Sequence, residues 1–254
     1  MKLLVVNPNI SAGMTRRIGA AARAAAPADV EIVAVNPTSG PVSIEGYYDE
    51  AFAVPGLIEE IVKGEAAGAD ASIIACFDDT GLEAARCRAS GPVIGIGEAA
   101  FHLASLIAHR FSIVTTLSRS IAPIETNLMK YGLERRCARV RACEVPVLAL
   151  EDPASDAREK LSNEIRLAKS QDGAEAIVLG CAGMAELAAS LAREHDMPVV
   201  DGVAAAVRLA SSLVALRLTT SKLGAYASPL AKPFAGAFAH MGAPREAPMA
   251  PGGE

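Results

Sequence analysis

Two segments of this chain repeat one pattern, in which an apolar run rich in β-branched residues ends at a cysteine. Residues 71–76 read ASIIAC and residues 176–181 read AIVLGC. A helical pattern follows each cysteine, and then come a proline, a short strand and a pair of alanines. The matching positions are Pro92, Ala99 and Ala100 after the first cysteine, and Pro198, Ala205 and Ala206 after the second. All strand–helix units look alike to some degree, but agreement at this many points favours an internal duplication.

Apolar runs typical of buried strands alternate with helical patterns along most of the chain. The predicted strands are 2–7, 30–36, 71–76, 91–97, 111–116, 137–145, 176–181 and 197–201. The predicted helices are 14–26, 47–68, 80–90, 98–108, 122–132, 152–173, 184–195 and 202–216. Such alternation is typical of parallel sheets with right-handed crossovers. We therefore expect an α/β fold of two similar lobes, each a parallel sheet flanked by helices, related by a pseudo-twofold axis with the active-site cleft between them.

The repeat also predicts where the lobes begin and end. We assign 1–97 together with 203–240 to the first lobe, because the C-terminal helix is expected to return to it, and 98–202 to the second lobe. Residues 241–254 have no core-forming pattern and are expected to be a loose C-terminal arm.

Prolines predict two local features of the helices. Pro55 is expected to break or shift the helix 47–68, because proline lacks the N–H that a helix interior needs. Asp152 and Pro153 are expected to begin the helix 152–173 as its cap and its first residue.

The composition argues against several classes of protein. A chain of 254 residues can bury a substantial core, and its net charge of -5 gives no electrostatic basis for binding nucleic acid. No apolar run approaches the roughly 18 residues that a membrane-spanning helix needs. The N-terminal MKLLVVNPN lacks the small-residue cleavage site of a signal peptide. We expect a cytoplasmic protein that binds neither nucleic acid nor membrane.

The cysteine pattern predicts free thiols. The five cysteines are Cys76, Cys87, Cys137, Cys143 and Cys181. Their number is odd, no pair has CxxC spacing, and a reducing compartment disfavours disulfides. The four histidines form no ligand cluster with them, so we expect no metal site.

Cys76 and Cys181 are the residues on which a chemical role depends. Ligands of parallel sheets sit beyond the carboxyl ends of the strands, where both cysteines lie. Each precedes a helix, whose N-terminal partial positive charge is expected to favour thiolate. Two thiols facing each other across a cleft can remove a proton from one face of a carbon and return one to the other, without a cofactor. A single cysteine at a strand end would be interpreted as a small buried hydrophobe, but two equivalent ones favour function.

The segments around both cysteines resemble the aspartate/glutamate racemase superfamily, and most closely its hydantoin racemase and allantoin racemase branch. The likeness is carried by IACFDDTGLEAAR and VLGCAGM, and also by LLVVNPN, NPTSGPVSIEG, IVTTLSRS and TSKLGAY, from Met1 to about Phe234. It implies a homo-oligomer that racemises 5-substituted hydantoins without a cofactor, with Cys76 and Cys181 as the catalytic pair. Thr80 and Ser118 stand where relatives often have proline, and neither is expected to touch the cysteines.

Position along the chain and the resemblance give further candidates for substrate binding. They are Asn9, Ser43, Glu45, Phe77, Thr115, Thr116, Ala182 and Gly183. Asn9 follows the first strand, where it serves equally well as a helix cap, and the two threonines end the equivalent strand. Ser43 and Glu45 lie in a loop rich in glycine and proline. Backbone N–H groups at the other three positions can hold a developing enolate oxygen.

Two carboxyl groups shortly after Cys76 have two alternative roles. Asp78 and Asp79 are either general bases or, as we prefer, partners of a helix N-terminus.

The alternatives within the same chemistry are an allantoin racemase and a racemase of aspartate or glutamate. No basic cluster flanks either cysteine motif, which disfavours a free dicarboxylic amino acid as substrate. From a different class, a bilobed protein that binds a small molecule without catalysis also fits. A hydrolase or decarboxylase with one cysteine is disfavoured, because two thiols are present and no histidine lies near either motif.

Overall fold

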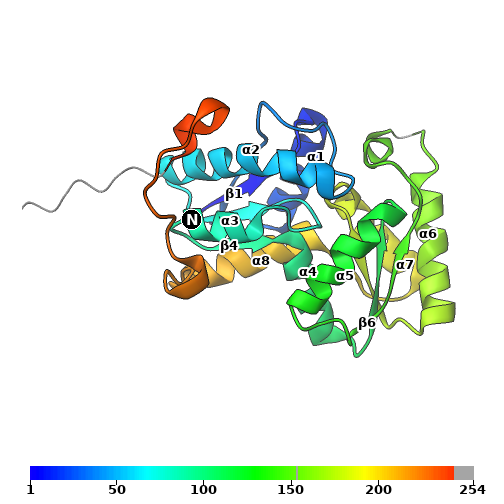
Figure 1. The fold of residues 1–254 in the computed structure, drawn as a ribbon. Helices are drawn as coiled ribbons and strands as arrows, with labels where there is room; N and C mark the ends of the chain where they lie inside the picture. Colours follow the sequence, from blue (N-terminus) through cyan, green and yellow to red (C-terminus); the bar gives the residue numbers. More distant parts are fainter. Residues whose placement is uncertain (153, 243–254) are drawn as a thin grey trace, which may run out of the picture.

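A computed structural model of the protein describes residues 1–152 and 154–242, in which strands and helices alternate (Figure 1). The strands are β1 (Lys2–Val6), β2 (Glu31–Val35), β3 (Ala71–Ile74), β4 (Val93–Gly95), β5 (Phe111–Thr115), β6 (Cys137–Ala142), β7 (Ala176–Gly180) and β8 (Val199–Asp201). The helices are α1 (Ala12–Ala25), α2 (Tyr47–Ala66), α3 (Leu82–Arg88), α4 (Ile96–Ile107), α5 (Ile121–Lys130), α6 (Ala157–Leu167), α7 (Ala188–His195) and α8 (Gly202–Ala215).

The strands form two parallel four-stranded sheets with the same topology. Their orders are β2-β1-β3-β4 and β6-β5-β7-β8, so the second sheet repeats the first with every strand number raised by four. This repeat confirms the predicted two-lobed α/β fold. The central pairs end in register, with Val6 beside Ile74 in one sheet and Thr115 beside Gly180 in the other. The residues that follow these four strands therefore meet at the carboxyl edges of the sheets.

The helices α4 and α8 join the two sheets. Each begins directly after an edge strand, and the two helices pack against each other. A Cβ at Gly202, the first residue of α8, would lie 2.6 Å from the carbonyl oxygen of Ile96, the first residue of α4, so only glycine permits this approach. The paired alanines that marked the repeat are all buried here, and one apolar cluster continues from Val5 in the first sheet to Val178 in the second.

Three expectations about helices differ from the structure. The helix α2 is continuous through Pro55, because the buried side chains of Ala53, Leu57 and Ile61 hold it on both sides of the proline. The helix 184–195 is instead a 3-10 helix over Ala182–Leu187 followed by α7.

The helix expected from residue 152 begins at Ala157, and Asp152 does not cap it. The chain before it forms a 3-10 helix (Val147–Glu151) that is hydrogen-bonded to the first lobe. Ser11 Oγ of that lobe donates to Glu151 Oε1 at 2.9 Å. Asp152 instead accepts a hydrogen bond from the N–H of Ala154 in a local turn. The predicted first helical residue, Pro153, lies outside the described residues, as do residues 243–254 of the expected C-terminal arm.

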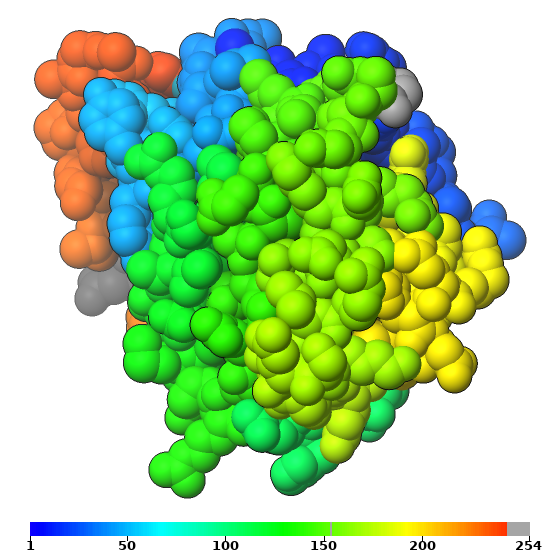
Figure 2. Space-filling view, turned by 90° about the vertical axis from the view of Figure 1, so that its right-hand side faces the viewer, coloured from blue at the N-terminus to red at the C-terminus, as the bar shows by residue number. Residues whose placement is uncertain are grey.

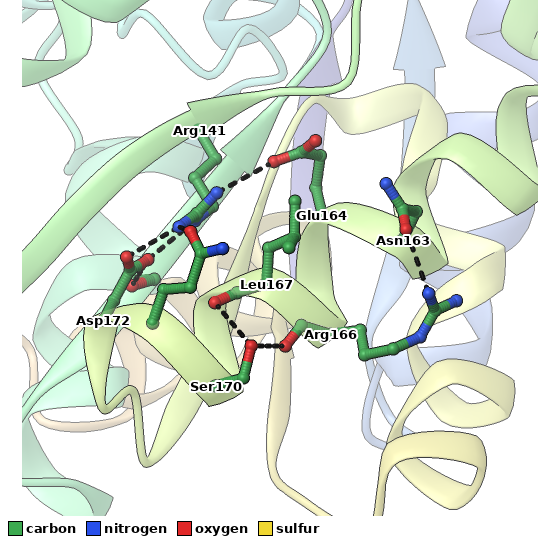
Figure 3. A network of polar contacts seen from close by, with 9 residues as sticks. Arg141, Asn163, Glu164, Arg166, Leu167, Ser170 and Asp172 are labelled. Carbon is green, nitrogen blue, oxygen red and sulfur yellow. Dashed lines mark hydrogen bonds and ion pairs between the residues drawn. The ribbon is translucent and has the colours of Figure 1, made fainter.

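The helix α6 covers the outer part of the second sheet and is tied to it by one arginine (Figure 3). Arg141 of β6 reaches Asp172 through its Nε at 2.7 Å and Glu164 of α6 through its Nη1 at 3.2 Å. Asp172 also accepts a hydrogen bond from Ser112 of β5. Both Arg141 and Asp172 are almost fully buried, so the network fixes the turn after α6 against the sheet.

The second lobe and the C-terminal segment occupy different parts of the surface. The side shown in Figure 2 is formed mainly by the second lobe, drawn in green to yellow. The C-terminal segment lies beside α2 and α3 instead (Figure 1). Lys222 donates to the carbonyl of Arg86 in α3, and His240 contacts Glu59 in α2 at 2.7 Å. Within the described part of the chain, no helix is both long and apolar enough to cross a membrane.

Candidate active site

One cavity lies where the carboxyl ends of the four central strands meet. About 420 Å³ of space lies within the cavity and its open mouth together, with solvent space at the mouth included, and residues from both sheets line it. Cys76, two residues beyond β3, and Cys181, directly beyond β7, both line this cavity. The structure therefore brings the two cysteines of the repeat to one site.

The two cysteines have equivalent backbone surroundings. The backbone N–H of Asp78 acts to lower the pKa of Cys76, and the backbone N–H of Gly183 acts to lower the pKa of Cys181. In each case the donor lies two residues after the cysteine. A hydrogen bond to sulfur favours the thiolate over the thiol and so lowers the thiol pKa.

Burial outweighs these donors, and the expectation that a helix N-terminus lowers both thiol pKa values is wrong. Desolvation raises the pKa of Cys181 to about 12 and raises the pKa of Cys76 well above its usual value, with Asp78 adding to the shift at Cys76. The helix effect is missing because neither cysteine directly precedes an α-helix. A turn separates Cys76 from α3, and a 3-10 helix follows Cys181.

Thr80 touches Cys76, contrary to expectation. Its hydroxyl donates to Cys76 Sγ over 3.3 Å, and the threonine is 2% exposed. The tight turn brings the two side chains together, since the N–H of Asp79 donates to the carbonyl of Cys76 and the N–H of Leu82 to the carbonyl of Asp79. Ser118 does not reach the cysteines, because it is exposed and its N–H donates to Glu144.

Asp79 complements a helix N-terminus, but the helix is α4 and not the following α3. Its carboxylate accepts hydrogen bonds from the N–H groups of Gly97 at 2.9 Å and Glu98 at 2.8 Å, and from the hydroxyl of Tyr131 at 2.8 Å. A Cβ at Gly95 would lie 2.0 Å from Asp79 Oδ1, so a glycine is required there. Burial raises the pKa of Asp79 to about 7 although these hydrogen bonds oppose the shift.

Asp78 lines the cavity and belongs to a carboxyl cluster. Burial, together with the nearby charges of Glu50 and Asp79, raises its pKa to about 8. Glu50 has a buried carboxylate oxygen without a hydrogen-bond partner among the described residues, and burial raises its pKa as well. Asp78 is therefore largely protonated at neutral pH in the empty site.

Most of the candidate substrate-binding residues reach the cavity. Those that line it are Asn9, Phe77, Thr115, Thr116 and Ala182. The hydroxyl proton of Thr115 is already donated to the carbonyl of Gly180, so this threonine offers a substrate only its acceptor oxygen. The amide oxygen of Asn9 accepts from Ser11 N, and Ser11, not Asn9, caps α1.

The remaining three candidates lie outside the lining. Gly183 directs its N–H to Cys181, as described above. Ser43 and Glu45 flank Ile44, which does line the cavity. Glu45 reaches across the cleft instead, where its Oε1 accepts a 3.0 Å hydrogen bond from the N–H of Val147.

Several lining residues were not among the candidates named from the sequence. They are Asn7, Pro8, Met14, Ile44, Ala75, Ser120, Val147 and Gly180. All of them except Met14 and Val147 stood in the quoted motifs, where no role was assigned to them. The amide of Asn7 holds the turn after β1 by donating to Asn9 and Thr15. Ile44 comes from a loop of the first lobe and Val147 from the start of a 3-10 helix of the second lobe, so only the folded chain brings them to one cavity.

The cavity offers no evident metal site. In residues 1–152 and 154–242, no three side chains of histidine, cysteine, aspartate or glutamate are arranged to hold a metal ion. The polar groups at the site are thiols, amides, hydroxyls and largely protonated carboxyl groups, which suit a neutral ligand rather than a strongly charged one.

Fold and site together define a class: two duplicated α/β lobes that present one cysteine each to a shared cavity. The model of the Asp/Glu/Hydantoin racemase family matches residues 3–210, and the chain belongs to this family.

Relatives cover nearly the whole chain. A hydantoin racemase of Rhizobium meliloti is 50% identical over 236 residues, which make up 93% of this chain and 98% of that protein. A hydantoin racemase of Pseudomonas sp. (strain NS671) is 47% identical over 95% of this chain and 97% of its own length. The solved structure of an allantoin racemase from Klebsiella pneumoniae superimposes with a TM-score of 0.93 at 51% identity, covering 95% of this chain and 99% of that chain.

Proposed function

We propose that this protein racemises 5-monosubstituted hydantoins without a cofactor, by moving protons at C5 between Cys76 and Cys181. The observation that carries the proposal is that equivalent cysteines of a duplicated fold line one cavity. The hydantoin racemases at 50% and 47% identity support the substrate class. Allantoin is itself a 5-substituted hydantoin, so the allantoin racemase structure fits the same chemistry and keeps allantoin as the alternative substrate.

The reaction needs one thiolate and one thiol at a time. The thiolate takes the C5 proton from one face of the ring, and the electron pair of that bond moves into the neighbouring carbonyl to give an enolate. The opposite thiol then donates its proton to the other face, and the electron pair returns to form the new C–H bond. The two sulfurs have exchanged protonation states, so the enzyme is set for the reverse direction and resets by exchange with water.

The cavity lining fits a neutral ring that carries one side chain. Amide and hydroxyl groups of Asn9, Thr116 and Ser120 can pair with the ring carbonyl and N–H groups. Met14, Ile44 and Val147 give an apolar wall for the substituent at C5.

The test is racemisation by single-cysteine variants. Cys76→Ser and Cys181→Ser are each expected to lower the rate by about 10³-fold, because a hydroxyl is a much weaker acid than a thiol. Cys87→Ser is the matched control. Cys87 lies outside the cavity lining, so this variant should leave the rate unchanged.

Polarimetry with 5-benzyl- and 5-isobutylhydantoin, allantoin, L-aspartate and L-glutamate defines the substrate. Substantial activity without either cysteine would exclude the scheme. Activity confined to allantoin or to the amino acids would replace the substrate, and no activity on any of them would favour a binding protein.

The same proposal extends to assembly and location. We infer that the protein is a homo-oligomer in the cytoplasm. We also infer that residues 1–97 and 203–240 form the first lobe and residues 98–202 the second. Large apolar side chains stand exposed on α2 and the C-terminal segment, with Tyr48 75% and Leu223 86% exposed, as expected of a surface that another copy covers. The helix α8 supports the lobe assignment because it packs on α1 and β3. Light scattering coupled to gel filtration would test the oligomer, and a monomeric mass would reject it.

A further inference from the structure

The hydroxyl of Thr80 is held against Cys76 by groups outside the cavity. Thr80 is 2% exposed, and its Oγ1 lies 3.3 Å from Cys76 Sγ. The preceding residue, Asp79, is fixed through its carboxylate to the start of α4 and to Tyr131. On the other side, the carbonyl of Asp78 accepts a 2.8 Å hydrogen bond from Asn127 of α5. The hydroxyl therefore meets the sulfur in a turn that is already in place before any substrate binds.

Among residues 1–152 and 154–242, no side-chain hydroxyl donates to the second cysteine. The residue four positions after Cys181 is Ala185, which has no hydroxyl. Both sulfurs receive an equivalent backbone N–H, from Asp78 and from Gly183, so the threonine hydroxyl is what distinguishes their donors.

The acidic neighbours of the two sulfurs also differ. The charges of Asp78 and, to a lesser extent, Glu50 raise the pKa of Cys76. The charges of Asp78, Cys143 and Glu45 raise the pKa of Cys181, and the contribution of Asp78 is the largest of these three. At Cys76 the charge of Asp78 is second only to burial in opposing the thiolate, and the Thr80 hydroxyl is the largest group that favours it.

We propose that Thr80 is a positioning residue whose hydroxyl stabilises the thiolate of Cys76, so that the carboxyl groups beside this cysteine do not leave the negative charge on Cys181 alone. The inference rests on the proposed two-thiol function, in which one direction starts from a Cys76 thiolate and the other from a Cys181 thiolate. An enzyme that held the charge on one sulfur would be trapped in the form that accepts one enantiomer. A donor at the disfavoured sulfur keeps both forms available.

Racemisation rates alone do not isolate this role. The two enantiomers of a simple hydantoin are equally stable, so kcat/KM must be equal in the two directions for every variant. The reactivity of each thiol towards iodoacetamide is the direct readout, because only the thiolate reacts. Initial rates at Cys76 and Cys181 are measured separately by peptide mass spectrometry of the folded enzyme near pH 8 and pH 9.

Thr80→Val keeps the shape of the side chain and removes the donor, whereas Thr80→Ser keeps the donor. In Thr80→Val the alkylation of Cys76 should fall about tenfold, which corresponds to about one pKa unit, while Cys181 reacts no more slowly than before. Thr80→Ser should restore most of the Cys76 rate. Thr126→Val is the matched control, because among the described residues the hydroxyl of Thr126 bonds only to the carbonyl of Ala122 within α5.

Three results would overturn the proposal: an unchanged Cys76 rate in Thr80→Val, a Thr80→Ser variant as slow as Thr80→Val, or an equal loss in the Thr126→Val control. These results do not depend on turnover. A failure to racemise any hydantoin would reject the proposed function, while the thiol rates would still decide the role of Thr80.

Discussion

The carboxylate of Asp79 accepts a 2.8 Å hydrogen bond from the hydroxyl of Tyr131, and this bond joins the turn after Cys76 to the end of α5. The same carboxylate caps α4 through the N–H groups of Gly97 and Glu98. The cysteine of the first lobe is therefore held in place by helices that follow the first sheet in sequence. Changes at Tyr131 should act on the site through this turn, although Tyr131 does not line the cavity.

Tyr131→Phe is expected to destabilise the protein more near pH 8 than near pH 5. Burial raises the folded-state pKa of Asp79 from 3.8 to about 7. The unfolded chain therefore releases this proton at lower pH, and the contribution of Asp79 to stability falls as pH rises from about 4 to about 7. The tyrosine hydroxyl offsets part of this loss once the carboxylate is charged. Urea unfolding should show a loss of about 1.5–3 kcal/mol near pH 8 and about 1 kcal/mol near pH 5.

Tyr47→Phe is the control for this experiment, because Tyr47 is 60% exposed on α2 and should change stability little at either pH. Equal losses for Tyr131→Phe at both pH values would show that Asp79 does not titrate between them.

The racemisation rate is expected to rise with pH above neutrality and then to rise less steeply from about pH 8, which gives a bend in the pH–rate profile. It rises because the pKa of Cys181 is raised to about 12, so the thiolate fraction grows with every step in pH. It bends because Asp78, whose pKa is raised to about 8, ionises in this range and its charge opposes the thiolate at both cysteines.

Asp78→Asn removes this charge and keeps the backbone N–H that donates to Cys76. The variant should lose the bend and exceed the wild-type kcat/KM above about pH 8, after the uncatalysed rate is subtracted. A bend of the same size in Asp78→Asn would assign it to another group, such as the substrate.

Arg141→Met should cost about 3–5 kcal/mol of unfolding free energy, because it leaves a buried carboxylate without its cation. Arg141 is 8% and Asp172 5% exposed, and the arginine lowers the pKa of Asp172. The stabilisation is present above the unfolded carboxylate pKa and is lost as pH falls through the lowered folded value. Since the network lies at the outer side of the second sheet (Figure 3), the KM of the folded variant should be unchanged.

Arg158→Met is the matched control, because the pair of Arg158 with Glu194 is exposed, at 49% and 37%, and should contribute about 0–1 kcal/mol. Similar losses for the two variants in denaturant unfolding would contradict the account of the buried network.

The sequence predicted the features that repeat along the chain. Apolar runs predicted the strands, and the matching Cys–helix–Pro–strand pattern predicted both the duplicated topology and the meeting of Cys76 with Cys181. These features were accessible because each depends on local order and on the fixed geometry of parallel sheets.

What escaped prediction depends on contacts between distant segments. The sequence does not show that Asp79 caps α4, or that Ile44 and Val147 line one cavity from different lobes. The expected lowering of the thiol pKa values failed for a related reason, since desolvation depends on what the fold places around each sulfur. The contact between Thr80 and Cys76 is local, but it depends on the tightness of one turn, in which Asp79 takes a positive φ of 51°.

The central claim, proton transfer by two cysteines on opposite faces, is tested most directly by racemising one pure enantiomer of 5-benzylhydantoin in deuterium oxide. Samples are taken in the first few per cent of reaction and resolved by chiral chromatography with mass spectrometry. The thiol that donates carries solvent deuterium, and the thiolate that accepts takes the protium of the substrate. The account predicts product that contains deuterium at C5 and recovered substrate that does not. Unlabelled product, or label entering the recovered substrate as fast as the product, would show that one group serves both faces and would contradict the account.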